Sequence, residues 1–314
     1  QLHIGKSSSK CSPVKRGDQQ NAECAPQQTG HCSQETDYLR ISSPLEIRIC
    51  DPACGSGHIL VYAFELLYSI YEEEGFDTPE IPGLILQNNL FGIEIDERAA
   101  ELAAFALVMK AREKDRRFFK RAATCGELVE PNICLIEKVE IEENDLQTYM
   151  DKVGRDLFTA NLEETLQQFK DADNFGSLIR PIETDVEGVR KMLETKGVEG
   201  NMFLAGTHES VLKILRMVEF LRPRYHVVVA NPPYMGGKGM NEELGKFAKK
   251  EYPDSKSDLF AMFIERNLDL VVKQGCVGMI TMQSWMFLSS FESLRKKILE
   301  NDTILSMSHL GARG

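Results

Sequence analysis

The stretch that most constrains the fold runs from His226 to Met235 and reads HVVVANPPYM. Its valines and alanine form an apolar, β-branched run that is typical of a strand buried on both faces. The two prolines that follow remove two backbone N–H groups and force the chain out of the sheet. The sequence therefore places a polar amide, a rigid turn and an aromatic ring at the carboxyl end of a central strand, where open α/β sheets bind ligands.

The groups at this turn suit an exocyclic amine. Asn231 carries a side-chain carbonyl acceptor, and the backbone carbonyls around Pro232 are available as acceptors as well. Two such acceptors would hold an NH2 group and draw electron density toward its nitrogen, so the amine could attack a strongly electrophilic methyl group without a general base. Tyr234 offers a flat face to a planar base, a contact worth roughly 1–3 kcal/mol. Taken alone, the same turn is also compatible with a stiff loop around a buried ring.

A second turn lies near the start of the predicted fold. The strand 45–50 runs into Asp51–Gly57 (DPACGSG), and apolar residues at helical spacing predict a helix over 58–74. Its glycines let a ligand approach the backbone, and the N–H groups of the following helix favour a carboxylate. The turn has neither the full GxGxxG spacing nor the Lys-Ser/Thr of a phosphate loop, which weakens the dinucleotide and ATP interpretations.

A carboxylate follows in the next predicted strand, 90–96. Glu94 is flanked by apolar residues near the end of that strand, before an alanine-rich helix over 97–120. An acidic side chain in this position can bind both hydroxyls of a ribose, as it does in nucleotide-binding folds. Alone it could equally be a charge facing solvent, but the glycine turn upstream favours the ribose interpretation.

Composition bounds the class of protein. The chain has 314 residues, 42% of them hydrophobic, and a net charge of −11. These values fit a large α/β domain, and no apolar run approaches the roughly 20 residues of a membrane span. The acidic balance argues mildly against nucleic acid, although residues 110–121 contain seven basic and two acidic residues. Cys50, Cys54, Cys134 and Cys276 lie in or beside apolar stretches, which predicts reduced core thiols in a cytoplasmic protein. No metal site is predicted, because Cys11, Cys24 and Cys32 fit no common zinc spacing.

Longer stretches carry a resemblance to a known family. DPACGSG, FGIEID and NPPY resemble the motifs of S-adenosylmethionine-dependent N6-adenine DNA methyltransferases. The match extends over DPACGSGHILVYAF, AAFALVMKAREKDRRFF, NFGSLIRP, HVVVANPPYMGGKGMN, YPDSKSDLFAMFIER and TMQSWMFLSSFE, and covers residues 41–313. Over this length the chain resembles the adenine methyltransferases of BREX phage-defence systems.

The resemblance implies roles for the matching residues. The cofactor S-adenosyl-L-methionine is expected on these positions: Asp51, Pro52, Ala53, Cys54, Gly55, Gly57, Glu94 and Ile95. An acidic side chain after the third strand, 132–139, should contact the adenine amine of the cofactor. Asp173 is the candidate and Glu137 its competitor. Four residues are expected to bind an adenine flipped out of double-stranded DNA: Asn231, Pro232, Pro233 and Tyr234.

Further contacts with DNA are predicted after this turn. Lys238, in a glycine-rich loop, and Lys246 are the candidate phosphate contacts, although the loop could also be a plain linker. Trp285 and Phe287 could wall the base pocket or belong to the core.

The predicted fold is a doubly wound, mostly parallel, Rossmann-like methyltransferase sheet with one antiparallel edge strand near the C-terminus and a helical insertion. Four segments follow: a polar, disordered stretch over 1–43, a cofactor-binding half over 44–139, the helical insertion over 140–222 and a catalytic half with NPPY over 223–314. The helices of the insertion are expected over 157–169, 186–196 and 208–221, capping the cofactor side.

Two departures from the family pattern set further expectations. The segment before Pro44 lacks the helical, Thr-Pro-containing motif that usually contacts the cofactor carboxylate, and the sequence stops where family members continue into a target recognition domain. The chain is therefore expected to bind cofactor but to methylate DNA poorly by itself. Alternatives are a methyltransferase acting on protein glutamine or rRNA guanine amines, which share NPPY, and a non-catalytic scaffold for other BREX proteins or for a phage inhibitor.

Overall fold

One sheet organises the computed structural model, which describes residues 2–6, 39–120, 129–154, 157–183, 185–196 and 204–311. Within these residues the strand order is β4-β3-β2-β5-β6-β1-β7. The strands are β1 (Leu2–Lys6), β2 (Ile49–Asp51), β3 (Leu90–Glu94), β4 (Asn132–Leu135), β5 (Tyr225–Ala230), β6 (Val271–Met279) and β7 (Asp302–Met307). Five neighbouring strands of this sheet run parallel: β4, β3, β2, β5 and β6. The sheet grows outward from β2 in one direction and from β5 in the other, so the strand order switches between these two strands. Ligands bind at such a switch point in open α/β sheets.

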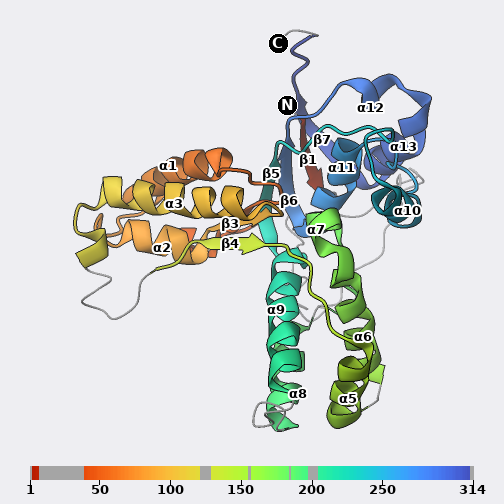
Figure 1. Cartoon of the computed structure of the whole chain (residues 1–314). Helices are drawn as coiled ribbons and strands as arrows, with labels where there is room; N and C mark the ends of the chain where they lie inside the picture. Colours follow the sequence, from red (N-terminus) through yellow and green to blue (C-terminus); the bar gives the residue numbers. More distant parts are fainter. Residues whose placement is uncertain are drawn as a thin grey trace, which may run out of the picture.

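Helices cover both faces of the parallel strands, as Figure 1 shows. On one face lie α1 (His58–Glu73), α2 (Ile81–Asn88) and α3 (Glu97–Lys114). On the other face lie α9 (Ala205–Leu221) and α11 (Leu259–Leu270), and α10 (Glu242–Glu251), α12 (Ser284–Phe287) and α13 (Glu292–Asn301) complete the C-terminal part. The structure confirms the predicted doubly wound, mostly parallel α/β fold.

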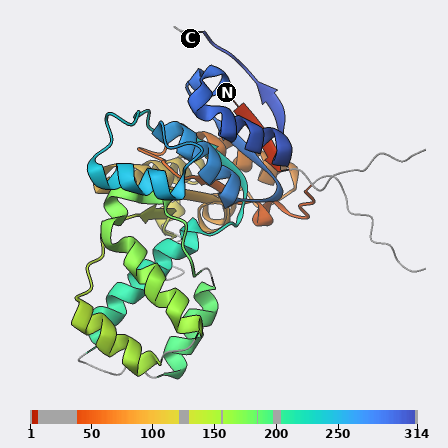
Figure 2. The same ribbon diagram turned by 90° about the vertical axis from the view of Figure 1, so that its right-hand side faces the viewer.

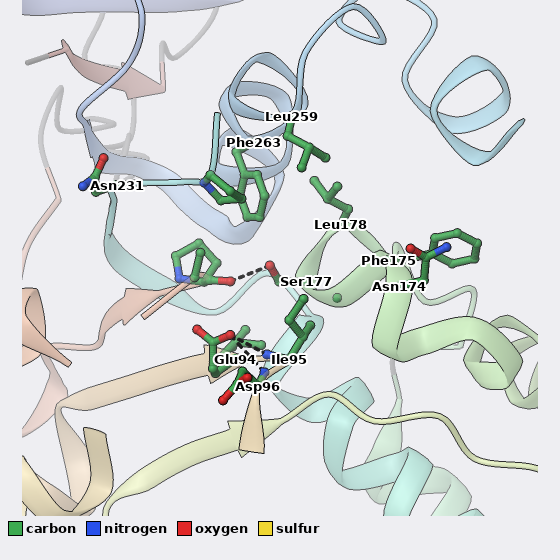
Figure 3. Close-up of a pocket in the computed structure, with 15 residues that line it drawn as sticks. Glu94, Ile95, Asp96, Asn174, Phe175, Ser177, Leu178, Asn231, Leu259 and Phe263 are labelled. Atoms are coloured by element: carbon green, nitrogen blue, oxygen red, sulfur yellow. Dashed lines mark hydrogen bonds between the residues drawn. The ribbon is translucent and has the colours of Figure 1, made fainter. Parts of the chain in front are cut away.

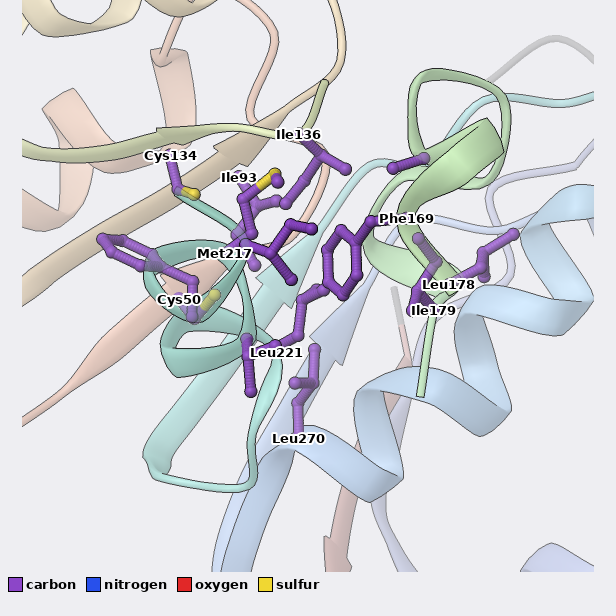
Figure 4. Packing of buried hydrophobic residues seen from close by; sticks show 14 of the residues in the cluster. Cys50, Ile93, Cys134, Ile136, Phe169, Leu178, Ile179, Met217, Leu221 and Leu270 are labelled. Carbon is purple, nitrogen blue, oxygen red and sulfur yellow. The ribbon is translucent and has the colours of Figure 1, made fainter. Parts of the chain in front are cut away.

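The larger part of the core lies between the sheet and the α9–α11 face. Leu221 from α9 and Leu270 from α11 meet Phe169 there, next to the strand residues Cys50 and Ile93 (Figure 4). All five side chains are buried. Fully burying a side chain of this size stabilises a fold by roughly 1.5–3 kcal/mol, so this contact fixes the segment around Phe169 against the sheet.

The segment between β4 and β5 is helical, as predicted. It contains α5 (Glu143–Val153), α6 (Leu157–Gln168), α7 (Ala172–Phe175) and α8 (Val186–Thr195) before α9. In Figures 1 and 2, α5, α6 and α8 form a lobe that projects from the sheet, and α9 leads back to it. Among the residues of the insertion that the structure describes, only α7 and the 3-10 turn Gly176–Leu178 line the pocket at the ligand edge, so most of this described part does not cap the cofactor side. No helix in the described parts of the chain is long and apolar enough to span a membrane.

The antiparallel strand differs from the prediction. β1 pairs antiparallel with both β6 and β7, so β7 at the edge again runs in the direction of β6. The antiparallel strand is therefore one position in from the edge and comes from the start of the chain. A strand order depends on pairing between distant segments, which the local apolar pattern of the last strand does not encode.

The N-terminal prediction also needs correction where the structure describes it. Leu2–Lys6 forms β1 inside the segment 1–43, for which the sequence predicts no ordered structure. Residues 7–38, which include Cys11, Cys24 and Cys32, lie outside the described residues. The predicted strand over 45–50 is shorter than expected: Pro44–Glu46 is a 3-10 turn capped by Ser43, and β2 begins at Ile49.

Candidate active site

A pocket of about 450 Å³ opens at the carboxyl ends of β2, β3 and β5 (Figure 3). Its walls come from the turn after β2, the end of β3, the α7 segment, the turn after β5 and helix α11. The lining residues are Pro52, Ala53, Ile93, Glu94, Ile95, Asp96, Asn174, Phe175, Gly176, Ser177, Leu178, Asn231, Pro233, Leu259 and Phe263. The two turns singled out in the sequence thus face one cavity, which has the size of a small-molecule site.

The turn after β2 adopts its shape through glycine. Gly55 and Gly57 have φ angles of 52° and 83°, in the left-handed region that favours glycine. A side chain at Gly57 would also meet Ala103 Cβ at 3.0 Å, so a glycine there lets α1 and α3 pack closely. Pro52 and Ala53 line the pocket, whereas the other predicted residues of this turn (Asp51, Cys54, Gly55 and Gly57) are not part of the lining.

Asp51 is the buried carboxyl of this turn. Its Oδ1 accepts a hydrogen bond from the Ala53 N–H at 3.1 Å. Burial, with a smaller contribution from Glu94, raises the pKa of Asp51 to about 7. Burial likewise raises the pKa of the neighbouring Cys54 thiol, which makes that thiol an inert packing group.

Glu94 connects the turn after β2 with the turn after β3 through hydrogen bonds. Its Oε2 accepts from the Gly55 N–H at 2.7 Å, and its Oε1 accepts from the N–H groups of Ile95 at 2.8 Å and Asp96 at 3.1 Å. Three backbone donors hold the carboxylate at the pocket wall, and a carboxylate has further lone pairs to offer to a diol. The Glu94 carboxylate, which is predicted to bind a ribose, is therefore oriented before any molecule enters the pocket.

The α7 segment forms the opposite wall. Gly176 approaches Ile95 so closely that a Cβ there would lie 2.8 Å from Ile95 Cγ2. Ser177 donates from its Oγ to the Pro52 carbonyl at 2.5 Å, and the buried Arg266 of α11 donates from Nε to the Ser177 carbonyl at 2.8 Å. These bonds fix the wall between the turn after β2 and helix α11.

The acidic candidates for the cofactor adenine do not line this pocket. Asp173 is exposed and outside the lining, and Glu137 pairs with Lys213 at 2.8 Å. The next residue along, Asn174, does line the pocket, as does the polar Ser177 of the same wall. Sequence reasoning missed Asn174, Phe175 and Ser177, although the polar and glycine residues of the NFGS run were a signal that this segment forms a turn.

At the turn after β5, Asn231 and Pro233 line the pocket and Pro232 is buried. The Tyr234 hydroxyl donates toward Asn231 Oδ1 at 3.1 Å and toward the Ile280 carbonyl at 3.3 Å. Partial burial raises the pKa of Tyr234, so its hydroxyl stays protonated as a donor at neutral pH. The ring is half exposed, as a stacking face requires.

The loop after this turn is fastened to helix α11. The carboxylate of Asp258, which caps α11, accepts from the Met235 N–H at 3.1 Å, and the Leu259 N–H donates to the Met235 carbonyl at 3.0 Å. The cap thus positions Leu259 and Phe263, which line the pocket beside Asn231.

The residues predicted for DNA contact lie outside the pocket. Lys238 is exposed, and Lys246 pairs with Glu242 at 2.9 Å and Glu243 at 3.1 Å on the surface of α10. Trp285 is buried in the core, whereas Phe287 is 71% exposed. The phosphate contacts of both lysines stay predictions.

The doubly wound sheet, with both turns facing one pocket at the strand ends, defines a class: a Rossmann-like methyltransferase domain. The model of the Eco57I restriction-modification methylase family matches residues 88–314, which is more than two thirds of the chain. The chain therefore belongs to that family.

Among its relatives are adenine-specific methyltransferases. The chain is 42% identical over 294 residues to "Adenine-specific methyltransferase BrxX" of Escherichia coli O9:H4 (strain HS), covering 86% of this chain and 24% of that protein. It is 38% identical over 274 residues to "Adenine-specific methyltransferase PglX" of Lacticaseibacillus casei (strain Zhang), covering 85% and 22%. These matches confirm the resemblance predicted from the motifs. The chain spans about a quarter of the length of these relatives.

Proposed function

We propose that the chain is the methyltransferase unit of a phage-defence enzyme of the BREX type, which transfers a methyl group from S-adenosylmethionine to N6 of adenine in double-stranded DNA. The observation that carries this proposal is that Glu94 and Asn231 line the same pocket. The residue proposed to bind the ribose and the residue proposed to accept the amine thus share one cavity, which supports a transfer between a nucleoside cofactor and an amine.

The residues of the pocket fit the cofactor. The Glu94 carboxylate suits the ribose hydroxyls, and Ile95, which is 49% exposed, offers an apolar surface to the adenine ring. The buried carboxyl of Asp51 lies behind the turn that would hold the methionine end. When bound, S-adenosylmethionine supplies an electrophilic methyl group on a positively charged sulfur.

The chain's own residues would act on the amine. Asn231 Oδ1 and the carbonyl of Pro232 accept from the two N–H groups of adenine N6 and hold its nitrogen toward the pocket. Tyr234 stacks on the flipped base and, through its hydroxyl, keeps Asn231 Oδ1 in place. With the amine held in this way by Asn231 and the Pro232 carbonyl, the bound cofactor would supply the methyl group and its sulfur would keep the bonding electron pair. The extra proton on N6 would then leave to water.

Asn231→Ala tests this assignment. Loss of a preorganised acceptor typically costs about 10²–10³ in rate, so we expect transfer of labelled methyl groups to DNA to fall by that factor. Because Asn231 contacts the amine and not the ribose, the affinity for S-adenosylhomocysteine in calorimetry should change by less than about threefold. An Asn231→Ala protein with undiminished transfer would refute the proposed grip.

The choice of substrate is tested by offering other amines. At the low rate expected of the chain by itself, labelled cofactor should mark adenine in duplex DNA, and it should leave rRNA and glutamine-containing protein unlabelled. Labelling of rRNA or protein in place of DNA would overturn the DNA assignment while keeping the methyltransferase class. A chain that binds no cofactor at all would favour the scaffold alternative. Contacts with other BREX proteins or a phage inhibitor and a cytoplasmic location stay predictions.

A further inference from the structure

We propose that Asp258, at the start of α11, is a positioning residue for the methyl transfer, because its carboxylate fixes the turn that would hold the amine relative to the helix that lines the pocket. Asp258 itself does not line the pocket, whereas the next residue, Leu259, does. This inference rests on the proposed function, since it takes the turn after β5 to bind the amine.

One oxygen of Asp258 serves two elements. Its Oδ1 accepts from the N–H of Met235, directly after the turn, at 3.1 Å and from the N–H of Phe260, in the first turn of α11, at 3.4 Å. No hydrogen bond within the described residues uses its Oδ2. The role of this side chain therefore depends on one acceptor oxygen, which the amide of asparagine also offers.

The turn after β5 is held at its two ends. Its two prolines have no N–H to donate. Before them, the Ile280 N–H donates to the Ala230 carbonyl at 3.0 Å. After them, Met235 donates to Asp258 and accepts from the Leu259 N–H at 3.0 Å. Loss of the Asp258 carboxylate would leave the Met235 N–H without this acceptor and loosen the second end.

A short ladder places the following loop beside the start of α11. The Gly237 N–H donates to the Ser257 carbonyl at 3.0 Å, and Gly236 and Asp258 form an antiparallel bridge. These backbone bonds set the pairing of the two segments. The Asp258 carboxylate adds a bond that ties this pairing to the first turn of the helix.

The ring of Tyr234 is supported by the same turn of α11. It lies edge-on to the buried Phe260, with ring centroids 6.2 Å apart and planes inclined by 63°. The N–H of Phe260 is the helix donor that Asp258 binds. The same helix presents Leu259 and Phe263 to the pocket. The proposed stacking ring and one wall of the pocket thus share this anchor.

The rate of transfer should depend on this anchor more than the affinity for cofactor does. Reacting atoms must approach to about 3–3.5 Å, and a misplacement of about 1 Å can cost roughly 10²-fold in rate. The residue proposed to bind the ribose lies elsewhere: in Figure 3, Glu94 is across the pocket from Leu259 and Phe263. A small shift of the turn after β5 would therefore leave that contact in place.

Methyl transfer to duplex DNA and calorimetry with S-adenosylhomocysteine test this inference together. Asp258→Ala removes the shared acceptor, so kcat at saturating DNA and cofactor should fall by about 10- to 100-fold. The affinity for S-adenosylhomocysteine should change by less than about threefold. Asp258→Asn keeps an acceptor oxygen and caps helices as well as aspartate does, so its kcat should return to within about threefold of the native value.

Amide hydrogen exchange checks the geometry behind this effect. The segment 235–239 should exchange faster in Asp258→Ala than in the native chain, and at the native rate in Asp258→Asn, because only alanine removes the acceptor of the Met235 N–H. Native exchange of this segment in Asp258→Ala would show that the carboxylate does not hold the turn.

Asp185→Ala is the matched control for the loss of a helix cap. Asp185 caps α8, in the projecting lobe, and its Oδ1 accepts from the Gly188 N–H at 3.0 Å. This variant should lower the urea midpoint of unfolding and leave kcat and cofactor affinity unchanged.

The outcomes separate the inference from the proposed function. An undiminished kcat in Asp258→Ala, a loss that Asp258→Asn does not restore, or an equal loss of kcat and cofactor affinity would overturn the positioning role and leave the proposed function intact. A native chain that binds no S-adenosylhomocysteine, or transfers no methyl group to DNA, would refute the proposed function and the inference with it.

Discussion

Two carboxyl groups of the cofactor side illustrate how burial and partners give the same chemical group different tasks. Glu94 accepts hydrogen bonds from three backbone N–H groups, which orient its carboxylate toward the pocket. Asp51 accepts one such bond and is buried behind the turn, so its pKa rises to about 7. We therefore expect Glu94 to determine affinity and Asp51 to determine how stability varies with pH.

Glu94→Gln should weaken binding of S-adenosylhomocysteine by about 10- to 100-fold, because hydrogen bonds to a charged group contribute about 1.5–3 kcal/mol. The amide would also direct an NH2 group toward a backbone donor. Isothermal calorimetry measures the change, and Glu101→Gln on the exposed side of α3 is the matched control. If Glu94→Gln bound as tightly as the native chain, Glu94 would not be the ribose ligand.

The raised pKa of Asp51 predicts a stability that falls as pH rises. The folded chain holds this proton up to a pH of about 7, whereas the unfolded chain releases it near 3.8. The contribution of the protonated group is complete below about pH 4 and is lost progressively up to about pH 7. Between pH 5 and 8 the ionisation should lower the free energy of unfolding by roughly 2–3 kcal/mol.

Asp51→Asn removes this ionisation. The difference in unfolding free energy between the native chain and the variant, from urea titrations at pH 5, 6, 7 and 8, should therefore shift in favour of the variant as pH rises. A difference that stays constant across this range would show that Asp51 does not titrate as proposed.

At the scale of elements, α11 connects the catalytic turn with the opposite wall of the pocket. Asp258 at its start holds Met235, Phe263 lines the cavity, and Arg266 reaches the carbonyls of Ser177 at 2.8 Å and Leu221 at 2.6 Å. A single helix thus sets the distance between the two sides of the site.

Arg266→Met should lower the free energy of unfolding by about 3 kcal/mol, because two buried carbonyls lose a charged donor. Urea titration measures this loss, and Lys296→Met on the exposed face of α13 should change stability by less than about 0.5 kcal/mol. An Arg266→Met chain with native stability would mean that the carbonyls find other donors and that α11 is not fixed in this way.

The elements that sequence predicted best are those whose signals are local. The valine run, the glycine turn after β2 and the alanine-rich α3 follow from periodicity and turn chemistry, and Glu94 and Asn231 follow from their places at strand ends. The position of β1 and the contact between Asn174 and Asn241, 67 residues apart, depend on partners far along the chain. No local pattern encodes such a pairing. The local sequence likewise does not show that Asn174 lines the pocket and that Asp173 does not.

At the scale of the whole molecule, the charge distribution favours a cofactor-binding unit over a DNA-binding surface. The net charge is −11, and part of the basic run after Met109 is neutralised, since Lys110 and Lys114 both pair with Glu65 of α1. Because binding to duplex DNA depends on neutralising phosphates, we expect the chain alone to hold DNA weakly. Electrophoretic mobility shifts at 50 and 200 mM salt would measure this affinity, and tight binding at the higher salt would contradict the expectation.

A crystal structure with bound S-adenosylmethionine tests most directly whether a methyl donor and an amine held by Asn231 meet in one pocket. We predict the ribose hydroxyls on the Glu94 carboxylate, the base against Ile95 and the methyl group directed at the position that an amine on Asn231 would occupy. A cofactor bound outside this pocket, or with its methyl group turned away from Asn231, would contradict the account.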